Sequence, residues 1–513
     1  MSDNPEVRVE ILSEVPAHQR RQIVSGMRWT VWLSALAIPF SYGTTILLAR
    51  TSPEAVGTYG LLMVYIAVVQ SMLYLGGDAV TIKFLPEIDA SQRLSFLASY
   101  FLVICAASLP WLIAASLWAG KLHYLFGNHG STSFQLTILF LFPICILGSL
   151  SAAALKGLLE IRWAQILTRI PTIGFFMSCG GLFLWARPLL ATHYTQLIWG
   201  IYLGLTALAA FVGFRRLNRL KRWKDAWRYL HFFLPRGFWK YTLSLQQLSF
   251  INFFSGRLDV VLVLNFGNLT LVGEYVAIIS LVETIRLINR YLLDTLLPSL
   301  TNMVAMGNLP GASDVLKVHA RILFLANTAT TCGLILLAGP LVALLGPKYT
   351  SLVPLVILLS LLVGLAAPGT MAGTMLSSVG KQQRAVWLSL GQVGLYVLLF
   401  LSLWPRWHLL GAALAYGISW VLTKPPLLAI ASRSVPFRAP LAKDYAMFAI
   451  VAVSSAALEH WEPLGLGTGL AAWVVAMLLF LFFGQYSIPE ILRLVRCFVP
   501  VSSFFPKAAG NAQ

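Results

Sequence analysis

Apolar stretches of roughly 20 residues alternate along the whole chain with short polar breaks. At about 1.5 Å per residue, a helix of that length crosses a hydrocarbon core of about 30 Å. The pattern predicts an all-α polytopic membrane protein with about 14 transmembrane helices. These helices are expected at residues 29–49, 56–77, 95–118, 134–155, 163–186, 194–214, 241–266, 272–297, 320–345, 353–378, 385–404, 409–431, 444–460 and 467–486.

The composition excludes a soluble protein. Of the 513 residues, 58% are hydrophobic and 11% are charged, and the mean hydropathy is +0.77. A soluble globular protein carries about 25% charged residues. Lipid is therefore the solvent for most of the chain.

The charge distribution indicates how the chain is oriented in the membrane. Lys and Arg number 37 against 19 Asp and Glu, which gives a net charge of +18. Basic loops mark the cytoplasmic side of a membrane protein. We therefore expect both termini to be cytoplasmic and the excess charge to reflect topology, with no nucleic-acid partner. The polar, acidic first residues predict that no signal peptide is cleaved. With the N-terminus inside, the outer loops hold Arg50, Lys121, Arg187, Lys348 and Arg406 as their basic residues.

No motif for catalysis or for a cofactor is found in the sequence. The five cysteines show neither CxxC nor Cys/His spacing, and the patterns GxxxxGK[ST], HExxH and GxSxG are absent. No predicted loop is long enough for a catalytic domain outside the membrane. We therefore expect a protein that is not an enzyme, has no cofactor and no metal, and functions between its helices.

A short motif repeats at an offset of 216 residues. Val56-Gly57-Thr58-Tyr59 opens the second predicted helix, and Val272-Gly273-Glu274-Tyr275 opens the eighth. The offset also maps the first predicted helix onto the seventh, so the two copies share one orientation. The sequence predicts two parallel-repeat six-helix lobes around a central cavity, followed by two C-terminal helices. The expected parts are a cytoplasmic N-terminus 1–28, an N-lobe 29–214, a linker 215–240, a C-lobe 241–431, helices 13 and 14 within 432–486, and a cytoplasmic tail 487–513.

The linker 215–240 is the most basic segment of the chain. Its apolar residues Leu220, Trp223, Trp227 and Leu230 share one arc of a helical wheel, and most of its charges lie outside that arc. We expect an amphipathic helix on the inner leaflet. The alternative is a loop that only sets the topology.

The eighth predicted helix carries four charged residues on one face. At about 100° per residue, Glu283, Arg286, Arg290 and Asp294 share an arc of about 80°. Each ionisable group at membrane depth costs about 2.5–3.5 kcal/mol, so lipid is not expected to face this stripe. Either the stripe lines a hydrated cavity, or Glu283 with Arg286 and Arg290 with Asp294 neutralise one another on the helix surface.

Further candidate residues lie outside this stripe. Arg257 and Asp259, on the seventh helix, point about 200° apart, and Arg257 is the one we expect to face the cavity. Arg28 is a candidate for attracting an anion at the cytoplasmic mouth, with a simple interfacial anchor as the alternative. Arginine binds phosphate oxygens in a bidentate manner and stays charged at physiological pH. The predicted substrate-binding cations are therefore Arg257, Arg286, Arg290 and Arg28, and the supporting or coupling carboxylates are Glu283, Asp294, Asp78 and Asp259.

Motifs in both halves resemble those of Wzx-type polysaccharide flippases, which are grouped with multidrug-antiporter-like (MATE-like) transporters and lipid II flippases. In the first half they are Leu48-Ala-Arg-Thr-Ser-Pro-Glu-Ala-Val-Gly-Thr-Tyr-Gly60, Gly76-Gly77-Asp78 and Lys83-Phe84-Leu85-Pro86-Glu87; in the second they are Arg257-Leu-Asp259, Val272-Gly-x-Tyr275, Glu283 and Leu297-Pro298-Ser299-Leu300.

The resemblance implies transport of an undecaprenyl-pyrophosphate-linked oligosaccharide from the inner to the outer leaflet of the bacterial inner membrane, by alternating access of the two lobes. Such transport serves the synthesis of surface polysaccharides such as O-antigen or exopolysaccharide. The implied partners are the lipid-linked substrate, inner-membrane lipids, a polysaccharide polymerase and glycosyltransferases.

Two alternatives share the fold: a cation-coupled multidrug antiporter and a lipid II flippase. Against the antiporter, residues 29–49 contain no Asp or Glu, although such antiporters use a buried acidic residue in the first lobe. A major-facilitator permease is disfavoured because residues 78–93 lack the pattern Gly-x-x-x-Asp-Arg-x-Gly-Arg-Arg.

Overall fold

The structure is a computed structural model of the chain, and it is helical throughout the part that it describes. It describes residues 33, 36–89, 91–117, 132–158, 160–219, 231–305, 307–379, 381–435 and 442–484. The predicted N-terminus with Arg28, the tail 487–513 and residues 220–230 of the linker lie outside these ranges, and so does the side chain of Asp294.

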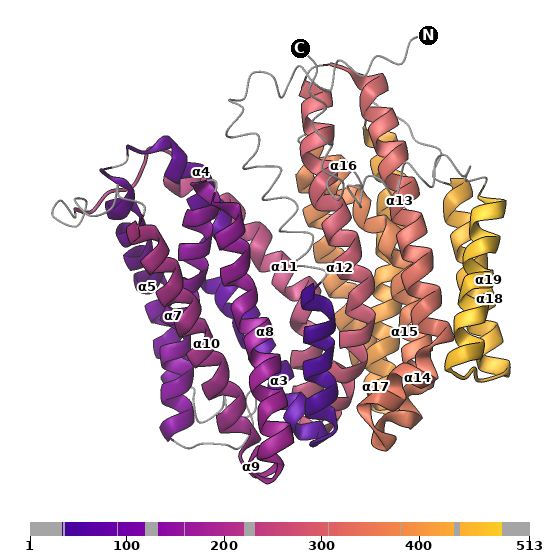
Figure 1. Ribbon diagram of the computed structural model, residues 1–513. Helices are drawn as coiled ribbons and strands as arrows, with labels where there is room; N and C mark the ends of the chain where they lie inside the picture. Colours follow the sequence, from indigo (N-terminus) through magenta and orange to yellow (C-terminus); the bar gives the residue numbers. More distant parts are fainter. Residues whose placement is uncertain are drawn as a thin grey trace, which may run out of the picture. The chain divides into compact units, whose positions relative to one another are not determined.

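The described residues fall into two compact units (Figure 1). The first unit is Met1–Ser280 with the short segments Leu345–Pro347 and Trp407–Ala412, and the second is the rest. The boundary therefore lies inside a helix, because α11 and the start of α12 are grouped with the first unit. The lobe boundary at residues 215–240 stays a prediction.

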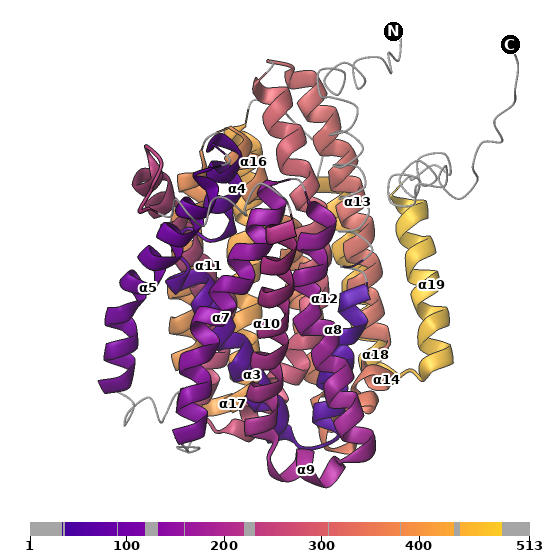
Figure 2. The ribbon, with the colours of Figure 1, turned by 60° about the vertical axis from the view of Figure 1, so that its left-hand side comes forward.

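In the first unit, three long helices pack side by side (Figure 2): α7, α8 and α10. An apolar helix, Leu36–Ala49, precedes them in the chain. The helices of this unit are α3 (Pro53–Val68), η1 (Val69–Leu73), α4 (Asp78–Glu87), α5 (Arg93–Leu117), α7 (Thr132–Gly157), α8 (Ile161–Trp185), α9 (Arg187–Thr192), α10 (Tyr194–Arg219), α11 (Phe238–Phe266) and the first turns of α12 (Leu269–Ala305).

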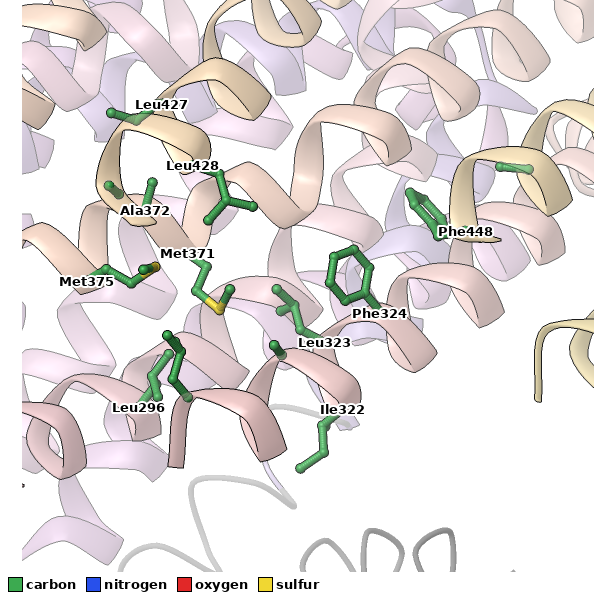
Figure 3. Packing of buried hydrophobic residues seen from close by; sticks show 14 of the residues in the cluster. Leu296, Ile322, Leu323, Phe324, Met371, Ala372, Met375, Leu427, Leu428 and Phe448 are labelled. Atoms are coloured by element: carbon green, nitrogen blue, oxygen red, sulfur yellow. The ribbon is translucent and has the colours of Figure 1, made fainter. Parts of the chain in front are cut away.

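The second unit contains the rest of α12 and a bundle in which the two C-terminal helices, α18 and α19, pack against α13. Its helices are α13 (Leu309–Leu336), α14 (Ala338–Leu345), η4 (Pro347–Leu352), α15 (Val353–Ala366), η5 (Ala367–Thr370), α16 (Met371–Ser378), α17 (Gln382–Ser434), α18 (Ala442–Trp461) and α19 (Leu466–Phe483). Figure 3 shows its apolar core, where Leu296 of α12, Phe324 of α13, Met371 of α16 and Phe448 of α18 belong to one buried cluster.

Most of the predicted membrane helices coincide with helices that could cross a membrane; α12, α18 and the shorter Leu36–Ala49, at the predicted spans 272–297, 444–460 and 29–49, do not meet the length and hydropathy criteria. Within the described ranges, nine helices are long and apolar enough to cross a membrane, and a tenth is added if the bent pair Phe238–Ile251 and Gly256–Phe266 counts as one span. One of the nine, Gln383–Arg433, covers two predicted spans. It is broken at His408, whose backbone is non-helical (φ 42°), so α17 consists of two arms. Each of the fourteen predicted stretches overlaps a helix in the described residues, although 56–77 ends in the turn 74–77 and 320–345 is divided between α13 and α14.

The repeated motif determines where α3 and α12 begin. Ser52 caps α3 by accepting a hydrogen bond from the Ala55 amide at 3.1 Å. Asn268 accepts a hydrogen bond from the Leu271 amide at 2.9 Å, immediately before α12. Each side chain satisfies an amide that has no partner within its helix. Ser52 and Asn268 are 216 residues apart, so the repeat extends to the helix caps.

The starts of α3 and α12 cross in direct contact, through equivalent positions of the repeat. A Cβ atom on Gly57 would collide with the carbonyl oxygen of Leu269, and one on Gly273 would collide with that of Pro53. Thr270 donates a hydrogen bond to its equivalent, Glu54, at 2.7 Å. The contacts are reciprocal, as at a two-fold axis. We call this contact the glycine crossing.

Candidate functional site

The charged stripe of α12 lies partly open in the second unit. The side chains of Glu283 and Arg286 are 26% and 24% exposed, and Arg290 is exposed. Ile285 and Asn289, between them in the sequence, are buried. The helix therefore buries the side opposite Glu283, Arg286 and Arg290 and leaves the side of these three charges more accessible.

Arg286 is held by three groups at once. Its Nη1 atom donates a hydrogen bond to the hydroxyl of Tyr416 at 2.8 Å. The same atom lies 3.9 Å from Oε1 of Glu283, the partner expected at i−3. The guanidinium carbon lies 4.8 Å from the ring centre of Trp420. The contact with Glu283 is long, so this carboxylate compensates only part of the charge on Arg286.

A second cation lies against the same ring. The ammonium nitrogen of Lys424 is 5.2 Å from the ring centre of Trp420, and the residue is half-buried. Lys424 precedes Arg433, at the end of its span, by nine residues, so it lies about 13 Å inside that end. Two positive charges thus lie within about 5 Å of one indole ring, among apolar helices.

Arg286, Lys424, Tyr416, Trp420 and Glu283 together form what we call the cationic site. Tyr416 and Trp420 are 3% and 5% exposed, so their rings pack inside the unit. Tyr416 contacts Arg286, and Trp420 contacts both cations. Cations against an aromatic face are attracted to it more strongly where water is scarce. Among the residues that the structure describes, the site brings two positive charges beside the Glu283 carboxylate, so its chemistry suits the binding of an anion.

Lys424, Trp420 and Tyr416 are not among the site residues predicted from the sequence. A signal for them exists, because residues 416, 420 and 424 follow each other at i, i+4 and i+8 and therefore lie on one face of a helix. This Tyr, Trp and Lys stripe is interrupted by apolar residues and contains a single charge. The hydropathy pattern therefore predicts only a membrane helix here and does not indicate a site.

Arg257 and Asp259 occupy different environments in the first unit. Asp259 is 3% exposed and accepts a hydrogen bond from the hydroxyl of Tyr275 at 3.0 Å. Tyr275 belongs to the repeated motif and is itself fully buried. Arg257 is half-buried. Arg257 lies in the first unit and Arg286 in the second, so their predicted convergence on one substrate stays a prediction, as does the coupling role of Asp259.

Asp78 is paired with a cation of a neighbouring helix. Its Oδ2 atom lies 3.3 Å from the ammonium nitrogen of Lys156 in α7. Asp78 is the first residue of α4 and follows two glycines with positive φ, Gly76 (72°) and Gly77 (65°). A carboxylate at a helix N-terminus is stabilised by the helix dipole. The position therefore serves the local structure, and a coupling role for Asp78 stays a prediction.

Donor groups for a metal ion are not gathered in the described part of the chain. No group of three or more His, Cys, Asp or Glu side chains there is close enough to hold one. Cys145, Cys179 and Cys332 are buried thiols without a disulfide.

Comparison with known proteins identifies the fold. No family model matches the sequence, and no curated protein matches it. Among solved structures, the lipid II flippase MurJ in an inward closed conformation has a TM-score of 0.65 at 13% identity, over 90% of this chain and 99% of that chain. An inward-facing multidrug resistance MATE family transporter of the MOP superfamily has a TM-score of 0.57 at 12% identity, over 80% and 98%. An outward-facing transporter of the same family has a TM-score of 0.55 at 14% identity, over 81% of this chain and 96% of that chain. The chain is a multi-pass helical membrane protein with the fold of these MOP-superfamily transporters, which confirms the predicted fold class.

Proposed function

We propose that the protein is a flippase for an undecaprenyl-pyrophosphate-linked oligosaccharide, which it moves from the inner to the outer leaflet of the bacterial inner membrane. Both of its termini are cytoplasmic in this proposal. The product serves the synthesis of a surface polysaccharide, with glycosyltransferases supplying the substrate and a polymerase consuming it.

The observation that carries the proposal is the cationic site. Arg286 of α12 and Lys424 of α17 place two positive charges against Trp420, and α17 is long and apolar enough to cross a membrane. Charges at this depth are costly and mark a substrate pathway. A diphosphate is the anionic group of the proposed substrate, and Arg binds its oxygens in a bidentate manner. The sugar attached to it is too polar to cross hydrocarbon unaided.

The sign of the charge separates this function from cation-coupled drug export. A cationic drug would be repelled by Arg286 and Lys424, whereas a lipid diphosphate would be attracted. A lipid II flippase remains a second candidate, supported by the likeness to MurJ over 90% of the chain. The two candidates share the diphosphate chemistry and differ in the sugar, so a substrate comparison separates them.

The test is transport by purified protein in vesicles. Undecaprenyl-diphosphate-linked oligosaccharide is placed in one leaflet, and its appearance in the other is followed with a membrane-impermeant sugar-modifying reagent. We expect transport by the natural protein and a loss of at least tenfold in Arg286→Gln, because a hydrogen bond to a charged group contributes about 1.5–3 kcal/mol. Arg433→Gln, an exposed arginine at the end of the same span as Trp420, is the matched control.

Three results bear on the proposal. Transport of lipid II in place of the oligosaccharide would replace the first candidate with the second. Equal transport by the Arg286→Gln and Arg433→Gln proteins would remove the cationic site from the function. Export of a hydrophobic cation without movement of either lipid would overturn the flippase assignment.

A further inference from the structure

The two cations of the cationic site differ in how far their charge is compensated. Arg286 has the Glu283 carboxylate at 3.9 Å and the Tyr416 hydroxyl at 2.8 Å. No hydrogen bond or ion pair of Lys424 is found with a residue that the structure describes, and its ammonium group lies against the Trp420 ring. The less compensated of the two charges is therefore that of Lys424.

We propose that Lys424 selects a lipid diphosphate over a lipid monophosphate. This inference rests on the proposed function and assigns the two cations separate roles. Arg286 binds one phosphate through its planar, bidentate donors, and Lys424 binds the second as a point charge. Both cations lie against the ring of Trp420. A monophosphate reaches one cation and leaves the other without a partner.

Gly369 fixes the position of Lys424. It lies in η5, the tight turn at Pro368 that interrupts α15 and α16. A Cβ atom at Gly369 would lie 2.7 Å from Cβ of Lys424 and would collide with its carbonyl carbon and oxygen. The backbone of η5 therefore packs directly on the backbone of Lys424, which glycine alone permits. Gly369 is a positioning residue in this scheme.

The helix that carries Lys424 does not fix this position by itself. Pro425 and Pro426 follow Lys424, and a proline has no amide hydrogen to donate. The carbonyl groups of Val421 and Leu422 thus lose their partners within the helix. With two helix hydrogen bonds missing at this point, the contact with Gly369 determines how the turn is oriented.

The test measures binding of two probes, undecaprenyl diphosphate and undecaprenyl monophosphate, to full-length protein in lipid nanodiscs. We expect the natural protein to bind the diphosphate more than tenfold more tightly. Lys424→Gln should lose about ten- to a hundredfold on the diphosphate and little on the monophosphate, while Arg286→Gln should lose affinity for both. Lys424→Arg should keep the preference, since it keeps the charge.

Glycine variants test the positioning role. Gly369→Ala should reduce diphosphate binding as Lys424→Gln does, and Gly373→Ala should not, because a Cβ atom at Gly373 meets no atom within 4 Å. In a Lys424→Gln background, Gly369→Ala should cause no further loss. A further loss there would show a general effect on folding and would overturn the positioning role.

The outcomes separate this inference from the proposed function. If the natural protein binds neither probe, the proposed function fails at this site. If it binds both probes equally, or if Lys424→Gln weakens both equally, the selection by Lys424 is wrong while the flippase proposal stands.

Discussion

Gln246 of α11 holds together the end of α3 and the turn that follows it. Its Nε2 atom donates hydrogen bonds to the carbonyl oxygens of Ser71 (3.0 Å) and Met72 (2.8 Å). Its Oε1 atom accepts one from the Gly76 amide at 2.9 Å. The chain here passes through the short π-helix η1 and then through two glycines with positive φ. No water replaces such bonds in lipid, so one side chain satisfies three backbone groups.

Replacing Gln246 with Leu should destabilise the protein by about 2–5 kcal/mol, because buried backbone groups lose their partners. The neighbouring Gln247 is exposed, so Gln247→Leu is the matched control. Thermal unfolding of both variants in the same detergent is the measurement. Equal midpoints of thermal unfolding for the two variants would show that the three hydrogen bonds of Gln246 contribute nothing to stability.

At the scale of elements, α3 and α12 show how a short sequence repeat becomes a structural one. The apolar stretches predicted both helices and the motif Val-Gly-x-Tyr related them as a repeat; both begin three residues before the predicted starts, at Pro53 and Leu269, which are 216 residues apart. The caps Ser52 and Asn268 are different residue types, so a comparison of the two copies by sequence does not match them. The glycine crossing was also unpredicted, since the sequence does not say which helices touch.

Gly273→Ala should force α12 away from the Pro53 carbonyl, because the added methyl group has no space. We expect a loss of about 1–3 kcal/mol, the usual cost of overpacking. Gly204→Ala is the control, since a Cβ atom there meets no atom within 4 Å and alanine favours a helix. Thermal unfolding distinguishes the two. An unchanged midpoint of thermal unfolding in Gly273→Ala would contradict the close contact between Gly273 and the Pro53 carbonyl.

At the scale of the whole molecule, the distribution of charge predicts which loops face which side. Lys348, in η4, and Lys381, just before α17, are both exposed. The predicted topology places Lys348 outside and Lys381 inside. The span between them, Pro347–Ser378, is interrupted by η5 and still passes the criteria for crossing a membrane.

Single cysteines at these two positions, in a background without the native cysteines, test the topology. A membrane-impermeant maleimide applied to intact cells should label Lys348→Cys and not Lys381→Cys. Inverted vesicles should give the opposite pattern. Labelling of both positions from one side would contradict the predicted orientation.

Hydropathy predicted the membrane helices well because lipid imposes one simple requirement on every span. It predicted the candidate site less well. Arg286 was found from its charge, whereas Tyr416 and Trp420 are ordinary residues of an apolar helix until the fold brings Arg286 to them. Lys424 was missed because it is a single charge in an otherwise apolar stretch and has no second charged residue on its helix face. Arg28 and the side chain of Asp294 lie outside the described residues, so their predicted roles are unchanged.

The glycine crossing also shows what joining two copies in one polypeptide permits. Two separate, identical chains meeting in this way would have to place the same side chain on both sides, and a pair of facing glutamates would repel. Fusion lets each copy change independently. Glu54 keeps its carboxylate while Thr270 supplies the hydroxyl that it accepts from, and the glycines, which have no room to change, remain alike.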